Sequence, residues 1–286
     1  MLNRRDFLKL AGITLGSTAF EWHFPISAEQ QGRILQRIAV QPTGEILLPD
    51  AVYPIKSVSG GWVRLPMGYL PQQAIQPMLP AHQQPFTDFP TWAEVSAPYA
   101  AIRTYADGQA PLLARPGHGA VFRVQRSLGQ WLEVAVNEQS GWVQSRQLEP
   151  IPAPSQATAT HALIEGSRLI LYQGDQVMLQ TSIVRPADLA TGDHYIAQFI
   201  PSFSNPAKTN PTPSPLPMHG EGIQGRGWGY AGIPWNLITD RGVWLHGVYW
   251  HHHFDRIADQ PQLELPLIAA RMMFSLFSSD SYLSIR

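Results

Sequence analysis

The 286-residue sequence contains no cysteine, and this absence excludes several kinds of chemistry. No disulfide can stabilise the fold, and no thiolate can act as a nucleophile. Stability must therefore come from an apolar core. The chain has 44% hydrophobic residues and is long enough for more than one domain, so it can bury such a core.

Charged residues are also scarce. They make up 14% of the chain, and the formal net charge is -1. Without a strong field of one sign, the chain has no long-range attraction for nucleic acid or for an anionic membrane. We therefore expect no nucleic-acid partner. Glycan or peptide partners would need no such field.

Long hydrophobic runs are missing as well. The apolar run at residues 10–20 is shorter than the ~20 residues that span a bilayer comfortably. It follows the sequence NRRDFLK at residues 3–9, and this arrangement resembles a twin-arginine export signal, a segment read by a receptor. The resemblance implies that the protein folds inside the cell and works in the envelope or outside.

We assign residues 1–28 to this signal segment. Ser27 and Ala28 form only a weak cleavage site, so an uncleaved membrane anchor stays open as an alternative.

Proline-rich stretches divide the remaining chain. Residues 77–90 and 150–154 lack apolar periodicity and cannot supply the backbone donors of a helix or sheet, so they are typical of linkers. They leave three segments near residues 31–75, 91–150 and 158–286.

The first two segments resemble each other. Each alternates apolar and polar residues between glycines, a pattern that predicts short antiparallel strands. Their order of a strand, a turn, a tryptophan-bearing strand and a Gly-aromatic strand resembles bacterial Src-homology-3-like barrels. The resemblance implies two small barrel modules that bind peptidoglycan or position a catalytic domain. For their tryptophans, a core position is favoured over ligand contact: Trp62, Trp131 and Trp142.

The third segment contains the most specific motif, YAGIPWNLITDRGVWLHGVYW at residues 230–250. His246 and Gly247 within it, the following Tyr249-Trp250-His251, and the apolar run at residues 269–277 resemble the bacterial L,D-transpeptidase catalytic domain. That family joins peptidoglycan stem peptides through a cysteine thioester. The resemblance implies a β-rich domain with a helix behind the nucleophile.

The family's Ser-His-Gly-Cys motif is replaced here by Asp259-Gln260-Pro261-Gln262. Gln262 at the nucleophile position has no acidic proton to lose, and Gln260 at the base position cannot titrate near neutral pH. Pro261 removes a backbone N–H from the turn. Losing a nucleophile and its base together removes on the order of a million-fold of rate, so we expect no catalytic residues.

The remaining motif residues could still form a binding cleft. The resemblance places His246 and Gly247 at a strand end, beside the aromatic side chains of Tyr249 and Trp250 and the imidazole of His251. Such a surface suits recognition of a stem peptide or a glycan without turnover.

Metal binding is the alternative chemistry for this stretch. Imidazole and carboxylate groups are good zinc ligands, and the weak candidate set is His251, His253 and Asp255. On one straight strand His251 and His253 would share a face, whereas His246 would lie on the other. A structural or cleft-wall role is therefore favoured, and we expect no metal and no cofactor.

Together these patterns predict a mainly β protein. It would have two small Src-homology-3-like barrels followed by an L,D-transpeptidase-like β-rich domain with one or two helices. The predicted function is an exported, inactive homologue that binds peptidoglycan or a cell-wall protein. Two alternatives remain: an active transpeptidase or hydrolase with a non-cysteine nucleophile or a His-bound metal, and a scaffold in which only the barrels bind.

Overall fold

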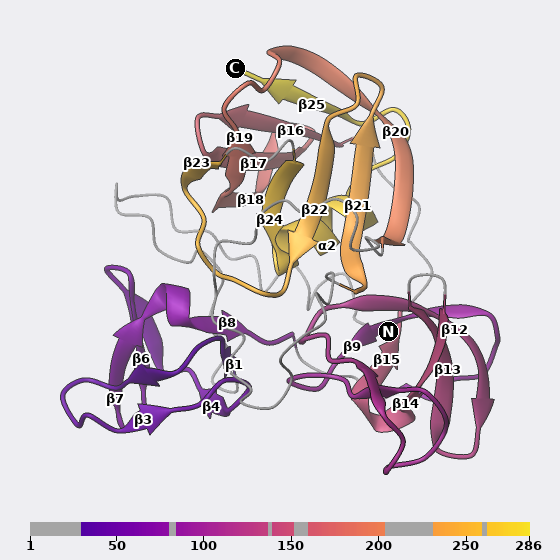
Figure 1. Ribbon diagram of the computed structural model, residues 1–286. Helices are drawn as coiled ribbons and strands as arrows, with labels where there is room; N and C mark the ends of the chain where they lie inside the picture. The colour runs from indigo at the N-terminus through magenta and orange to yellow at the C-terminus, as the bar shows by residue number, and fades with distance from the viewer. Residues whose placement is uncertain (1–29, 80–83, 137–138, 152–159, 204–230, 259–261) are drawn as a thin grey trace.

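The computed structural model describes residues 30–79, 84–136, 139–151, 160–203, 231–258 and 262–286. Strands dominate these residues and fall into three groups, each with its own cluster of buried apolar side chains (Figure 1). The predicted mainly β class is confirmed. We call the groups the N-terminal, central and C-terminal modules; the division into domains at the predicted boundaries stays a prediction.

The N-terminal module contains three small sheets, with strand orders β4-β1-β8, β2-β3 and β5-β6-β7. Buried and exposed side chains alternate along β6, where Val63 and Leu65 point inward while Trp62 and Arg64 point outward. The strands are β1 (Gln31–Ile34), β2 (Ile38–Ala39), β3 (Ile46–Leu47), β4 (Val52–Pro54), β5 (Ser57–Ser59), β6 (Trp62–Leu65), β7 (Gly68–Pro71) and β8 (Ile75–Pro77).

The central module is one antiparallel sheet with the order β11-β10-β14-β13-β12-β9-β15. Its longest pairing joins β13 to β14, from Trp131 opposite Gln144 to Val136 opposite Gln139. The strands are β9 (Thr91–Val95), β10 (Ile102–Arg103), β11 (Leu112–Ala114), β12 (Val121–Leu128), β13 (Trp131–Val136), β14 (Gln139–Gln144) and β15 (Leu148–Pro150).

The C-terminal module is a mixed sheet with the order β18-β17-β16-β25-β20-β21-β22-β24-β19-β23. Three of its pairings are parallel: β16 with β25, β22 with β24, and β19 with β23. The strands are β16 (Thr160–Glu165), β17 (Arg168–Gln173), β18 (Gln176–Ser182), β19 (Val184–Pro186), β20 (Gly192–Phe203), β21 (Ile233–Thr239), β22 (Trp244–Val248), β23 (Arg256–Ala258), β24 (Gln262–Pro266) and β25 (Tyr282–Ile285).

Helix α2 (Leu267–Leu276) follows β24 directly and packs against β21, β22 and β24. Pro266 fixes the backbone just before its first turn, and alanine, leucine and methionine favour the helix that follows. Most of its side chains are buried, as expected for a helix that is apolar nearly all round. No helix in the described part of the chain is long and apolar enough to cross a membrane.

The central and C-terminal modules pack tightly against each other. Tyr249 and Ala231 of the C-terminal module belong to the apolar cluster of the central module, and Val121 of β12 belongs to the C-terminal cluster. Two glycines allow this approach. A Cβ on Gly119 would lie 2.1 Å from Leu267, and a Cβ on Gly232 would lie 2.6 Å from Phe122.

Arg33 of β1 joins the N-terminal module to both others. Its side chain is buried, and its guanidinium donates hydrogen bonds to Asp50, to the Pro98 carbonyl and to the Tyr249 carbonyl. A Cβ on Gly117 would meet this guanidinium at 2.0 Å, so only glycine leaves room for it. One buried cation therefore contacts all three modules.

Candidate functional site

His246 and Gly247 lie on β22, the strand beneath α2. A Cβ on Gly247 would come within 3.0 Å of the Ala270 Cβ and 3.3 Å of Pro234, so glycine permits the close packing of strand and helix. The Gly247 carbonyl accepts a hydrogen bond from His246 Nδ1 at 3.1 Å. The local role of Gly247 is thus to let α2 pack over the end of β22.

Gln262, at the position expected for a nucleophile, begins β24. Because β24 runs parallel to β22, Gln262 pairs with Trp244 and Glu264 pairs with His246. The Gln262 side chain hydrogen-bonds His246, and burial lowers the pKa of His246 although Glu264 acts in the opposite direction. The two residues form a neutral imidazole–amide pair. Asp259, Gln260 and Pro261 lie outside the described residues.

His251 is held by partners at both ring nitrogens. Nε2 lies 2.8 Å from Glu264 Oε2, and Nδ1 accepts a hydrogen bond from the His253 backbone N–H at 3.2 Å. Since Nδ1 is the acceptor, Nε2 carries the proton and donates it to Glu264. Both side chains are buried, and Arg256 lies 3.7 Å from the same carboxylate oxygen. In this geometry neither nitrogen of His251 is free for a metal or a substrate proton.

The chain does not continue as one straight strand through the histidines. Strand β22 ends at Val248, and residues 249–254 have no regular secondary structure. The prediction that His246 lies on the opposite face from His251 and His253 assumed one straight strand through all three residues. That assumption was wrong, because the backbone turns after Val248. Asp255 has φ of 61° and donates its backbone N–H to Ile183. Within the described ranges, no group of three or more His, Cys, Asp or Glu side chains could hold a metal ion.

The two predicted cleft aromatics occupy different environments. Tyr249 is buried and its hydroxyl donates to the Ala231 carbonyl at 2.7 Å, so its ring belongs to the contact between modules. Trp250 is half-buried. Its ring lies 5.9 Å from that of His246 and 5.1 Å from that of Tyr249. Of this pair, Trp250 is the one that retains an accessible surface.

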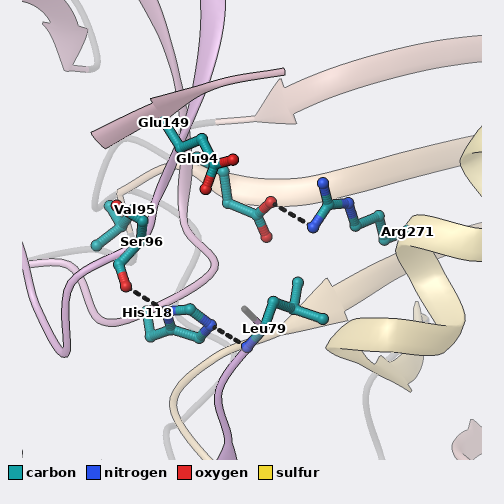
Figure 2. A pocket seen from close by; sticks show the side chains of 7 residues that line it. All are labelled: Leu79, Glu94, Val95, Ser96, His118, Glu149 and Arg271. Carbon is teal, nitrogen blue, oxygen red and sulfur yellow. Dashed lines mark hydrogen bonds and ion pairs between the residues drawn. The ribbon is translucent and has the colours of Figure 1, made fainter. Parts of the chain in front are cut away.

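A second polar cluster lies where the central module meets α2 (Figure 2). Glu94 of β9 pairs with Arg271 at 3.2 Å, while His118 accepts a hydrogen bond from the Leu79 N–H at 2.8 Å. Burial raises the pKa of Glu94 to about 7; Glu149 adds to this rise and Arg271 opposes it. Burial also lowers the pKa of His118 to about 3. The remaining cavity is only about 10 Å³, too small for a substrate.

The sequence did not point to Glu264, Glu94 or Arg33, although all three are buried and charged. Each is the one charged residue of a short strand, as Glu264 is in the sequence Gln-Leu-Glu-Leu-Pro of β24. A single charged residue in an otherwise uncharged strand is the sequence signal that could have identified them.

The barrel tryptophans differ from one another. Trp131 is buried, as the core interpretation expects, whereas Trp62 is 40% exposed. Trp142 is half-buried, and the guanidinium of Arg126 lies 5.3 Å from its ring centroid.

One family model matches part of this chain. Residues 96–150 match the family model of the bacterial SH3 domain, which covers most of the central module. No curated protein is similar enough in sequence to count as a match.

Several solved structures resemble this chain. An L,D-transpeptidase C442S mutant from Enterococcus faecium is 14% identical, covers 46% of this chain and 50% of its own, and has a TM-score of 0.30. An L,D-transpeptidase from Stackebrandtia nassauensis is 9% identical, with coverages of 47% and 58% and a TM-score of 0.31. One from Mycobacterium smegmatis is 12% identical, with coverages of 58% and 82% and a TM-score of 0.34.

This chain thus spans about half the length of the Enterococcus faecium protein. All three TM-scores lie below 0.5.

Proposed function

We propose that this protein is an exported cell-wall protein, related to the L,D-transpeptidases, that binds peptidoglycan without performing transpeptidase chemistry. The observation that supports the absence of transpeptidase chemistry is the pairing of Gln262 with His246. The N–H protons of an amide are too weakly acidic for a histidine to remove one and create a nucleophile, and burial disfavours the charged form of the histidine partner. The pair can hold two strands together but cannot start acyl transfer.

The neighbouring groups support the same conclusion. Both ring nitrogens of His251 are engaged, so it cannot act as a base in place of a lost one. Ser275, a serine close to the motif, donates its hydroxyl proton to the Arg271 carbonyl inside α2. A relocated serine mechanism would have to break that bond and bring a base to the helix.

The chemistry is tested with the mature protein and a tetrapeptide stem as substrate. We expect no release of terminal D-alanine above a no-enzyme control. The triple variant Gln260→His, Pro261→Gly and Gln262→Cys should regain at most weak activity, because the supporting groups no longer hold a catalytic geometry. Turnover by the unmodified protein at a rate that tracks enzyme concentration would contradict the proposal.

Binding is tested by co-sedimentation with purified sacculi. Trp250→Ala should weaken binding by about 1–3 kcal/mol, the usual cost of losing an anchoring aromatic. Because Trp250 is half-buried, circular dichroism and thermal melting must accompany the assay. Tyr105→Ala serves as the control, since Tyr105 is an exposed aromatic residue of the central module. A chain that never co-sediments with sacculi would rule out the binding function.

A further inference from the structure

The N-terminal module carries an open hollow that the sequence motifs did not suggest. It has a volume of about 320 Å³ and is lined by Gln41, Pro42, Trp62 and Tyr69. The two aromatic residues belong to β6 and β7, whereas His246 and Gln262 belong to β22 and β24 of the C-terminal module (Figure 1).

The strands of the module hold the two aromatic side chains outward. Inward positions on β6 and β7 are filled by Val63 and Leu70, so Trp62 and Tyr69 face solvent and are 40% and 45% exposed. Arg64 pairs with Tyr69 and Trp62 with Pro71, so the two rings stand at diagonal positions of one hairpin. Large aromatic rings on solvated strands are poorly explained by packing alone.

Gln41 is fixed beside Tyr69 by two backbone hydrogen bonds, of 2.9 and 2.8 Å. Gly68 allows this contact, because a Cβ there would lie 2.2 Å from the Gln41 carbonyl oxygen, and its φ of 153° also favours glycine. The hollow is therefore framed by the paired strands β6 and β7 and by the bridge between Gln41 and Tyr69, so its lining backbone needs little ordering on binding.

The lining is neutral, and its polar atoms are available. No lysine, arginine, aspartate or glutamate lines the hollow. In the part of the chain that the structure describes, no side-chain hydrogen bond involves the Gln41 amide, the Trp62 indole N–H or the Tyr69 hydroxyl. The hollow thus offers two aromatic faces and an amide that can both donate and accept.

This combination fits a neutral sugar ring with an acetamido group. The C–H face of a pyranose can lie on an aromatic ring, and an acetamido group supplies one N–H and one C=O to match those of Gln41. A proline-rich peptide fits the chemistry less well. Proline has no backbone N–H, so a proline residue offers no donor to the side-chain oxygen of Gln41.

We propose that this hollow binds an N-acetylated hexose of a glycan strand, with Trp62 and Tyr69 contacting the ring and Gln41 selecting the acetamido group. The choice of a cell-wall glycan as the source rests on the proposed function. The chemistry of the hollow stands on its own residues.

Isothermal titration of the mature full-length protein with the β-1,4-linked tetramer of N-acetylglucosamine tests the site. The tetramer should bind, and Trp62→Ala should weaken it by at least about tenfold. Tyr105→Ala, which removes a similarly exposed ring from the central module, should leave the affinity unchanged. Gln41→Leu should abolish the preference for this tetramer over the β-1,4-linked glucose tetramer, which lacks acetamido groups.

Equal tetramer affinity in the unmodified protein and the Trp62→Ala variant, with both folded by circular dichroism, would overturn the proposal. So would binding of decaproline in place of the sugar.

Sacculus co-sedimentation separates this inference from the proposed function. If sacculi retain the protein but no sugar tetramer binds, the glycan site fails and the peptidoglycan-binding function stands. If the tetramer binds while sacculi do not, the site stands and the proposed function fails.

Discussion

The His251–Glu264 pair shows how contacts decide what a residue can do. A histidine next to a carboxylate resembles part of a proton-transfer system, yet the His253 backbone N–H occupies the second nitrogen of His251. The carboxylate is buried, and Arg256 lies 3.7 Å from it. The pair therefore stabilises the loop that follows β22.

Removing the imidazole should take away the hydrogen bond that His251 Nε2 donates to the buried Glu264 carboxylate. We expect His251→Ala to lower the free energy of unfolding by at least about 2 kcal/mol, measured by urea denaturation. The double variant His251→Ala with Glu264→Leu should cost less than the sum of the two single variants, because it removes both members of the pair. Strictly additive costs would mean that the two residues do not stabilise each other.

At this scale the sequence predicted the motif positions but not their partners. The assignment of Gln262 to the family's nucleophile position stays a prediction, and the structure brings Gln262 into contact with His246. Glu264 was missed because Leu263, Glu264 and Leu265 are all buried, on a strand covered on both faces. Alternation of apolar and polar residues predicts a strand with one face in solvent. This prediction is wrong for β24, because the polar side chain of Glu264 is buried and hydrogen-bonded to His251.

Among the elements, α2 was the best predicted. The run at residues 269–277 was expected to be helical, and the helix spans Leu267–Leu276. The course after β22 was predicted less well, because a single strand was assumed through the histidines. Buried contacts of Tyr249 with the central module redirect the chain there. Such contacts join residues far apart in the sequence, so the pattern of apolar and polar residues within one segment does not predict them.

The junction between β9 and α2 should make stability depend on pH. Burial raises the pKa of Glu94 to about 7 from its ordinary 4.5, with Arg271, Glu149 and His118 nearby. A raised carboxyl pKa means that the folded state binds the proton more tightly. The resulting stabilisation is complete below about pH 4.5 and is lost as the pH rises to 7; by linkage it amounts to roughly 3 kcal/mol.

Urea denaturation from pH 5 to pH 8 measures this slope. Glu94→Gln should flatten it, because the amide does not titrate, whereas Glu45→Gln, which alters an exposed carboxyl, should leave it unchanged. An unaltered slope in Glu94→Gln would assign the pH dependence to other groups.

For the whole molecule, Arg33 is a buried residue that contacts all three modules. Its hydrogen bonds reach Asp50 in its own module, Pro98 in the central module and Tyr249 in the C-terminal module. Neither composition nor periodicity distinguishes Arg33 from a surface arginine, so the sequence alone could not predict this junction.

Arg33→Ala should release the N-terminal module without unfolding it, because the module keeps its own apolar cluster. We expect a larger radius of gyration in small-angle scattering and faster proteolytic cleavage between the N-terminal and central modules. Arg64→Ala is the matched control, since Arg64 lies on the exposed face of β6. Unchanged scattering in Arg33→Ala would show that other contacts hold the modules together.

Export is the second prediction at this scale. The residues that predict it lie outside those the structure describes. Replacing Arg4 and Arg5 together by lysine should retain the protein in the cytoplasm, because lysine lacks the planar guanidinium of arginine. Cell fractionation and immunoblotting measure the outcome. Normal export of the double variant would indicate a different route.

The place of β25 in the C-terminal sheet sets the order in which that module can assemble during synthesis. Residues Tyr282–Ile285 lie between β16 and β20, in the interior of the sheet, although they come after both strands in the chain. Until they emerge, β16 and β20 each present an unpaired edge, a template for pairing with other chains. The two preceding modules can close while translation continues. The C-terminal module can complete its sheet only after β25 has been synthesised. A chaperone that covers the edges of β16 and β20 would act before that point.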